Sequence, residues 1–488
     1  MRSMGRARTL GTSSSGRCGL WVLRLWANYS RPALELVLAV RRAVGKETDR
    51  SLGERRFETS RPRPASWRGG KVVWFHAASL GECISVIPLV RAVLDQSSDR
   101  RALVTTSTTT ARDWIDDALS HQRLSGIAPE RVAVRLVPCD ARPAVERFLS
   151  AWAPDCGVFV ESELWPALLH TCSTHGVPLA LVSARLSARS FSLWSRPGLS
   201  AVAGALLSYF ELVIPQCAEQ SQRFARLGVR VAPGCVANLK WCDPGQAAPP
   251  AKLQAAFAQS VVQGRAAWVA LSTHDGEDVL LARAHEQLVS RAAQSSARPL
   301  LIVIPRHGND SSRVERAAGA YRERGLTVTL QSELELAELS AGSPDRAPAT
   351  PSDSRPSDVY VCDAIGQVQL LLRACKLVVV CGSLVEGVGG HNPLEPMRAG
   401  CAVIIGPHAP NVASTLAAVD AHSPKARAVE QLPCVDDLAR ALRLLEPARA
   451  DELRRRGQAA LGATRALEAD VLARTLSELQ AILPPPPS

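Results

Sequence analysis

The sequence predicts an α/β fold with two Rossmann-like, doubly wound domains facing a cleft. The chain has 488 residues, 46% of them apolar, which exceeds what one hydrophobic core usually serves and favours two domains. Short apolar runs alternate with amphipathic stretches, as is typical of βαβ units with a parallel sheet. The stretch 244–250, rich in Pro, Gly, Ala and Gln, separates two such series, and we interpret it as a hinge. None of the apolar runs suits a polytopic membrane protein.

The expected strands and helices follow this alternation in order. The first series predicts strands at 72–76, 102–105, 133–137, 157–160 and 178–182, with helices near 83–95, 110–120, 141–150 and 163–174. The second series predicts strands near 268–271, 299–304, 358–361, 376–380 and 402–405, and then a helical C-terminal region. We therefore assign residues 67–245 to an N-terminal domain and residues 246–488 to a C-terminal domain. Residues 341–357 are rich in Pro and Ser and are expected to form a disordered surface insertion.

Residues 1–66 are expected to form a basic segment followed by a linker. No Asp or Glu occurs before Glu35, and the stretch 20–44 is rich in Leu, Val and Trp but broken by Arg and Pro. Such a stretch suits a helix that lies in the lipid interface, with Trp21 and Trp26 at headgroup depth. The acid-free start also fits an organelle transit peptide. Both interpretations stay open at this point.

The charge balance favours an anionic partner. The formal net charge is +11, and the chain has 57 Lys and Arg residues, of which only six are Lys. Arginine suits phosphate and carboxylate groups, because its planar fork can bind them with two hydrogen bonds. Nucleic acid is disfavoured, since the aromatic residues are not interleaved with basic ones. The His and Cys residues are scattered without the spacing of a zinc site, so we expect no metal.

In the first series, polar side chains come directly after strands, where a doubly wound domain binds its ligand. Glu82 follows Ser79 at a strand-to-helix turn and could act as a base, or it could merely complement the helix dipole. Glu161 and Glu163 follow the fourth strand and could bind hydroxyl groups or position a base, or they could cap a helix. Arg185 follows the fifth strand, where it suits a carboxylate or phosphate unless it is simply solvated.

The second series repeats this arrangement with cationic and hydrogen-bonding residues. They are Ser272, Thr273, His274, Arg306, His307, Ser383, Gly389, Gly390, His391 and Asn392. A helix that starts with Asn392 and Pro393 after two glycines could point free N–H groups at an anion. Glu395 in its first turn could bind both ribose hydroxyls, or it could return to the Asn392 amide as a capping box. These features together describe a two-domain glycosyltransferase that uses a nucleotide sugar.

The order of the motifs resembles one family. HAASLGE, ESELWP, ARLSARS, NLK, STHDGED, PRH, CGSLV and GGHNPLEP occur in the order seen in 3-deoxy-D-manno-octulosonic acid (Kdo) transferases, from about residue 20 to residue 415. The resemblance implies an inverting enzyme of the glycosyltransferase-B architecture. Such an enzyme moves Kdo from CMP-Kdo to the lipid A precursor (lipid IVA) in lipopolysaccharide biosynthesis, at a membrane surface.

The resemblance also implies roles for individual residues. Glu82 matches the catalytic base that deprotonates the glucosamine 6-hydroxyl of the acceptor. The donor-binding positions are Arg306 and His307 for CMP, Ser383, Gly389, Gly390 and Asn392 for the phosphate side, Glu395 for the ribose, and Lys240 near the donor. The residues expected to position the acceptor or sugar are Ser79, Glu161, Glu163 and Arg185. No cofactor and no metal are expected beyond the donor substrate CMP-Kdo.

Two departures from the family pattern touch turns near the donor. The usual Gly-Gly-Ser appears as Cys381-Gly382-Ser383, and the usual Gly-Asn-Leu-Lys begins with Ala237. The expected partners are the lipid A precursor glycolipid, CMP-Kdo and a membrane surface, without nucleic acid. The expected location is the cytoplasmic face of a bacterial inner membrane, with the mitochondrion of a eukaryote as the alternative. A related two-domain transferase or epimerase that uses a UDP-sugar stays the alternative activity.

Overall fold

The computed structural model describes most of the chain as two compact units. The described residues are 21, 23, 26, 31–59, 62–124, 126–242, 249–292, 298–333, 356–364, 366–423 and 427–485. The first unit comprises Met1–Ala247 and Glu468–Ser488, and the second comprises Ala248–Leu467. The predicted insertion at 341–357 lies outside the described residues except for its last two positions.

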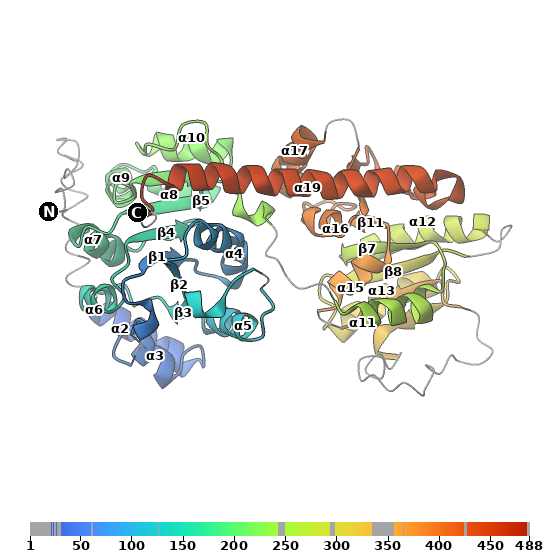
Figure 1. Cartoon of the computed structure of the whole chain (residues 1–488). Helices are drawn as coiled ribbons and strands as arrows, with labels where there is room; N and C mark the ends of the chain where they lie inside the picture. Colours follow the sequence, from blue (N-terminus) through green and yellow to red (C-terminus); the bar gives the residue numbers. More distant parts are fainter. Residues whose placement is uncertain are drawn as a thin grey trace. The chain divides into compact units, whose positions relative to one another are not determined.

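The first unit contains a six-stranded parallel sheet with helices around it (Figure 1). Its strands are β1 (Lys71–His76), β2 (Arg100–Thr106), β3 (Val132–Leu136), β4 (Cys156–Val160), β5 (Leu179–Ala184) and β6 (Leu212–Pro215), in the spatial order β3-β2-β1-β4-β5-β6. Its helices are α2 (Arg31–Ala43), α3 (Asp49–Arg55), α4 (Leu80–Asp95), α5 (Thr109–Ser120), α6 (Arg142–Trp152), α7 (Pro166–Thr174), α8 (Ala188–Trp194), α9 (Leu199–Leu207) and α10 (Ala218–Arg226). The strand order reverses between β1 and β4, which is where such a sheet binds its ligand.

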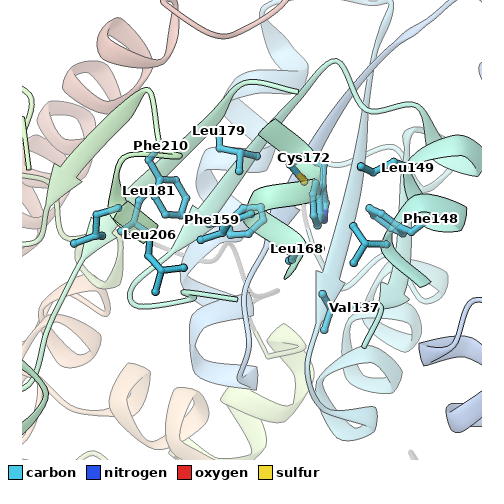
Figure 2. Packing of buried hydrophobic residues seen from close by; sticks show 14 of the residues in the cluster. Val137, Phe148, Leu149, Phe159, Leu168, Cys172, Leu179, Leu181, Leu206 and Phe210 are labelled. Atoms are coloured by element: carbon cyan, nitrogen blue, oxygen red, sulfur yellow. The ribbon is translucent and has the colours of Figure 1, made fainter. Parts of the chain in front are cut away.

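The core of the first unit explains why these segments form a sheet covered on both faces. All residues of β4 and β5 are buried, as expected for parallel strands with helices on either side. Phe159 of β4 stacks edge-on against Trp74 of β1, with the ring centroids 4.9 Å apart. Figure 2 shows Phe159 among Leu181 of β5 and Leu206 of α9. This packing fixes the ends of β1 and β4 relative to each other.

The second unit contains a seven-stranded parallel sheet, also flanked by helices (Figure 1). Its strands are β7 (Ala267–Thr273), β8 (Leu300–Pro305), β9 (Val328–Leu330), β10 (Val359–Val361), β11 (Leu377–Val380), β12 (Ala402–Ile405) and β13 (Val429–Gln431), in the order β13-β12-β11-β7-β8-β10-β9. Its helices are α11 (Ala251–Phe257), α12 (Glu277–Ala292), α13 (Ser311–Arg322), α15 (Val368–Ala374), α16 (Leu394–Arg398), α17 (Ala413–His422), α18 (Leu438–Leu442) and the part of α19 (Ala450–Leu479) that ends at Leu467. Here the strand order reverses between β7 and β11.

The predicted fold class of two doubly wound parallel-sheet domains is confirmed, but three of the strands were not predicted. β6 is only four residues long and ends in Pro215, while β9 and β13 are three residues long and only partly buried. Such short segments carry too little apolar periodicity to be distinguished from loops. The helix expected from 163 starts at Pro166 instead, so that Glu161 and Glu163 lie in the preceding turn.

The C-terminal residues depart from the predicted division of the chain. The sequence analysis assigned all of 246–488 to the C-terminal domain, whereas Glu468–Ser488 belongs to the first unit. The buried guanidinium of Arg100 donates to the Pro484 carbonyl at 2.8 Å. This contact joins the end of the chain to the first unit, where the same buried guanidinium also donates to the Gln96 side chain at 2.6 Å.

The N-terminal segment exposes apolar side chains on α2. Leu36 and Val40 are 68% and 55% exposed. Trp21 and Trp26 are also exposed, although the Trp26 indole donates to the buried Asp140 carboxylate at 2.9 Å. None of the helices in the described parts of the chain is both long and apolar enough to cross a bilayer.

Candidate functional site

In the first unit, the candidate residues gather where β1, β4 and β5 end. These three strands are neighbours in the sheet. Because parallel strands end at the same edge, the turns after them lie together. The predicted residues at this edge are Ser79, Glu82, Glu161, Glu163 and Arg185, and Lys240 joins them through an ion pair.

Glu82 is the residue at this edge best suited to accept a proton. It lies in the first turn of α4, whose N-cap is Ser79. Its carboxylate accepts hydrogen bonds from the Ala78 N–H and the Ser79 hydroxyl, both at 2.9 Å. Burial raises the pKa of Glu82, these two hydrogen bonds lower it, and the charges of Glu161 and Glu163 raise it further, so that the net change is upward. No cation among the described residues pairs with Glu82, which leaves it available as a base.

Glu163 is hydrogen-bonded by neighbouring side chains and is therefore not available as a base in the way that Glu82 is. The fully buried His76 places Nε2 3.3 Å from the Glu163 carboxylate and Nδ1 3.0 Å from the Thr105 hydroxyl. The Trp165 indole donates to the same carboxylate at 2.6 Å. Burial raises the pKa of Glu163, but the hydrogen bond and charge of His76 and the Trp165 indole outweigh it and lower the pKa. Glu163 is therefore ionised and positions its surroundings.

Glu161 forms an ion pair with Lys240, with Oε1 and Nζ 2.5 Å apart. Its backbone has φ of 62°, the left-handed region that residues other than Gly rarely adopt. Such strain is maintained only where the surroundings over-determine it, often at functional sites. Lys240, which we predicted near the donor, thus lies with the carboxylates of the first unit. Neither carboxylate after β4 caps α7, whose N-cap is Trp165 without a side-chain bond.

Arg185 is exposed after β5, and its guanidinium has no carboxylate partner within the described ranges. Its backbone N–H donates to the Glu161 carbonyl at 3.2 Å, which joins the two turns. An exposed guanidinium that has no carboxylate partner among the described residues suits an anionic group of a substrate. Among the described residues at this edge, Glu82 has no cationic partner, Glu161 and Glu163 are paired with Lys240 and His76, and the Arg185 guanidinium has no carboxylate partner.

In the second unit, the buried carboxylate of Glu277 holds the turns after β7 and β11 together. It accepts four backbone N–H bonds of 2.8–3.1 Å, from His274, Gly382, Ser383 and Leu384. These N–H groups belong to turns on either side of the point where the strand order reverses. Because all four N–H groups are bound to the Glu277 carboxylate, the two turns are held rigidly together, and we call these two turns the platform.

The glycine turn after β11 depends on the absence of side chains. Gly389 and Gly390 have φ of 93° and 88°. A Cβ on Gly389 would overlap the amide nitrogen of Asn411, and one on Gly390 would lie 3.2 Å from Ala409. The Gly390 N–H donates to the Gly382 carbonyl at 2.6 Å. These close approaches explain why the turn is built from glycine.

Four basic side chains near this platform interact electrostatically, namely those of His274, Arg306, His307 and His391. His274 and His391 place their Nε2 atoms 2.7 Å apart, and their ring planes differ by 11°. Arg306 and His307 follow β8 and are exposed. In the part of the chain that the structure describes, the Arg306 guanidinium has no carboxylate partner. The second unit thus presents an unpaired cation and three imidazoles, which suit a phosphate group.

Two of the predicted donor residues, Ser383 and Asn392, have internal partners. The Ser383 hydroxyl is buried, donates to the Val380 carbonyl at 2.6 Å and accepts from the Gly406 N–H at 2.8 Å. Asn392 accepts from the Leu394 N–H at 3.1 Å, so this N–H is not free for an anion. In place of the expected helix from Asn392, α16 has only five residues.

Glu395 lies in the first turn of α16 and is half-buried. Its carboxylate accepts from the Gln369 side chain at 2.9 Å, a contact with another helix rather than the capping box considered from the sequence. The ribose-binding role of Glu395 stays a prediction, as do the ligand roles of the other predicted residues and the cleft shared by both domains.

Neither His76 nor Glu277 had a role predicted from the sequence, and the contact of His391 with His274 was not predicted, although each residue stands inside a motif quoted above. Glu277 and His391 each contact residues more than 100 positions away. His76 contacts Glu163, 87 positions away. The only sequence signal was their place directly after strands. No group of three or more His, Cys, Asp or Glu residues in the described parts of the chain is arranged to hold a metal ion.

The family model of 3-deoxy-D-manno-octulosonic-acid transferase (kdotransferase) matches residues 50–242. A probable mitochondrial 3-deoxy-D-manno-octulosonic acid transferase of Arabidopsis thaliana is 32% identical over 405 residues, which cover 80% of this chain and 81% of that protein. The 3-deoxy-D-manno-octulosonic acid transferase of Bordetella pertussis is 34% identical over 338 residues, covering 69% and 71%.

Among solved structures, a glycosyltransferase from Rickettsia africae superimposes with a TM-score of 0.51 at 9% identity, covering 85% of this chain and 99% of that one. At this identity the likeness concerns the fold alone, and it agrees with the two parallel-sheet domains of glycosyltransferase-B enzymes. The identity to the curated transferases extends over most of their length. The chain therefore belongs to the 3-deoxy-D-manno-octulosonic acid (Kdo) transferase family of glycosyltransferases.

Proposed function

We propose that this enzyme transfers Kdo from CMP-Kdo to a lipid A precursor such as lipid IVA, with inversion at the anomeric carbon. The observation that carries the proposal is the environment of Glu82. Its carboxylate is half-buried, oriented by the Ala78 N–H and the Ser79 hydroxyl, and has a raised pKa. A carboxylate so placed can take a proton from an acceptor hydroxyl.

In this scheme each bond change has an assigned group. The acceptor hydroxyl oxygen bonds to the anomeric carbon of Kdo while its proton passes to Glu82. The bond from that carbon to the phosphate oxygen breaks, and CMP leaves with the electron pair. Arg306 and the imidazoles of the second unit would stabilise the departing phosphate. The Lys240–Glu161 pair and Arg185 would position the sugar and acceptor.

The acceptor proposal extends to a membrane surface. The exposed apolar residues of α2, among them Leu36 and Val40, suit contact with a lipid surface, while Arg41 and Arg42 beside them form ion pairs with Glu47 and Asp49. Flotation with anionic and neutral vesicles tests this, with Val40→Asp expected to weaken binding. We propose the cytoplasmic face of a bacterial inner membrane, with a mitochondrion as the second possibility. The mass of the mature N-terminus decides between them, because import removes a leader.

The decisive experiment incubates the purified full chain with CMP-Kdo and lipid IVA and reads the product mass. Wild type should add one or more Kdo units, whereas Glu82→Ala should add none and still be stabilised by CMP in a thermal shift. Transfer by Glu82→Ala at the wild-type rate contradicts the base assignment. Stabilisation by UDP but not by CMP would favour the alternative of a UDP-sugar transferase or epimerase.

A further inference from the structure

The contact between His274 and His391 restricts how many protons the two rings can carry. Their Nε2 atoms are 2.7 Å apart, a hydrogen-bond distance that requires one proton between them. With no proton there, two lone pairs would repel each other, and with two protons the hydrogens would collide. The pair is thus neutral overall or carries a single shared positive charge, and it cannot carry two while the contact lasts.

The surrounding backbone holds this contact in place. The His274 N–H is bound to Glu277 at 3.0 Å, and the His391 N–H donates to the Cys381 carbonyl at 3.3 Å. Gly382 lies beneath the His391 ring, because a Cβ there would lie 2.8 Å from its Cδ2 atom. The pair is therefore built into the platform rather than formed by two free surface side chains.

The charges facing the pair are mainly positive. Arg306 acts on both rings, and Arg313 and His307 act on His274. Glu277 is the acid that favours the charged form of His274. Two further acids nearby, Asp275 and Asp278, form ion pairs with Arg313.

Before an anion binds, the site therefore disfavours the positively charged form of the His274–His391 pair. Burial lowers the pKa of His391 to about 4, with smaller contributions from the charges of His274 and Arg306. Burial also lowers the pKa of His274; Glu277 opposes this, and the neighbouring cations add to it. At neutral pH the pair is uncharged beside a guanidinium that has no carboxylate partner among the described residues.

We propose that His274 and His391 form a proton-coupled receptor for the phosphodiester of the donor, which takes up a shared proton from solvent when that anion binds. The inference rests on the proposed function and adds a positioning and charge-regulating role for two residues. An anion beside Arg306 offsets the positive field at the rings and favours the charged pair. The shared charge then strengthens the hold on the phosphate without keeping an extra buried cation in the empty site.

The test uses the methyl ester of CMP, a phosphodiester whose own charge does not change between about pH 5 and pH 9, unlike that of CMP. Calorimetric titration of the full chain at one pH, in two buffers of different ionisation enthalpy, gives the number of protons exchanged. We expect an uptake of roughly 0.5–1 proton per site at neutral pH. The Kd should also rise with pH, by up to about tenfold per unit.

Variants locate the proton. His391→Gln and His274→Gln should each abolish the proton uptake and flatten the pH dependence of Kd. Two control variants, His307→Gln and His121→Gln, should retain the uptake. His121 is an exposed residue of the first unit. Binding by the wild type without proton uptake overturns the inference but leaves the proposed function standing. Uptake that disappears only in His307→Gln overturns it as well. Failure of the wild type to bind the ester at all overturns both, and this measurement does not depend on any variant folding.

Discussion

The two units use the same part of the fold for opposite chemistry. Each places its candidate site where the strand order reverses, after β1 and β4 in one sheet and after β7 and β11 in the other. Each also has a serine in the left-handed region at a shift in strand register, Ser183 in β5 and Ser272 in β7. The first site nevertheless presents carboxylates and the second presents cations. The fold thus decides where a site lies, and the residues after the strands decide what it binds.

The two sites also differ in how their acids are held. In the first unit, Glu161 and Glu163 are held by side chains, namely Lys240, His76 and Trp165. In the second, Glu277 is held by four backbone N–H groups. The charge of a side-chain partner can change with pH or be removed by substitution. Backbone N–H donors, in contrast, fix the geometry of the turns that carry them. We therefore expect substitutions in the first unit to change catalysis and those in the second to change donor binding.

The largest effect should come from an isosteric change at the base. Glu82→Gln should lower kcat for Kdo transfer by roughly 10²–10⁴-fold, because the amide cannot accept the proton. The matched control is Glu163→Gln, whose carboxylate is already engaged by His76 and should matter much less for kcat. Steady-state transfer from CMP-Kdo measures both. Equal losses in the two variants would contradict the distinction between a free and a held carboxylate.

The next effect compares Arg306 with Arg185, whose guanidinium groups lack carboxylate partners within the described ranges. Arg306→Gln should raise the KM for the donor by roughly 10–100-fold, the value of a charge-assisted hydrogen bond. Arg185→Gln, in the first unit, should leave the donor KM nearly unchanged. Initial rates against donor concentration give both numbers. A comparable rise for Arg185→Gln would show that the donor's anionic groups also rest on the first unit.

A smaller effect concerns the stability of the second unit. Gly389 and Gly387 have nearly the same φ, 93° and 94°. A Cβ on Gly389 would overlap Asn411, while one on Gly387 meets no described atom within 4 Å. Gly389→Ala should therefore lower the free energy of unfolding by about 1–2 kcal/mol more than Gly387→Ala. Thermal denaturation compares the two, and equal losses would mean that the turn does not depend on the close approach.

The smallest expected effect is a shift in the pH profile. Activity requires ionised Glu82, so it is lost as pH falls through the pKa of Glu82. Burial is the main cause of the raised pKa of Glu82, and Glu161 raises it further. Glu161→Gln should lower that pKa and move the acid limb of kcat/KM to lower pH. The exposed Glu211→Gln serves as the control and should leave the limb in place; movement to higher pH would contradict the assignment.

Much of the fold and part of the site follow from local sequence patterns. Residues 157–160 and 377–380 are short apolar runs, and both form buried parallel strands. Because ligand-binding residues of doubly wound domains follow strands, Glu82 and Arg306 could be selected from the sequence. The role of Lys240 could not be predicted in the same way, since its partner Glu161 is 79 positions away in the chain.

Local patterns of the chain were enough to predict the two parallel sheets, the chemistry carried by each turn and the family. The alternation of apolar runs and the order of the motifs can both be recognised in the sequence without a structure. The tertiary structure was needed to show which groups contact one another: Glu163 with His76, Glu161 with Lys240, and the turn N–H groups with Glu277. It also brought His274 and His391 into contact. The physical reason is that proximity and burial set the charge state of these groups, and both arise only when distant strands end side by side.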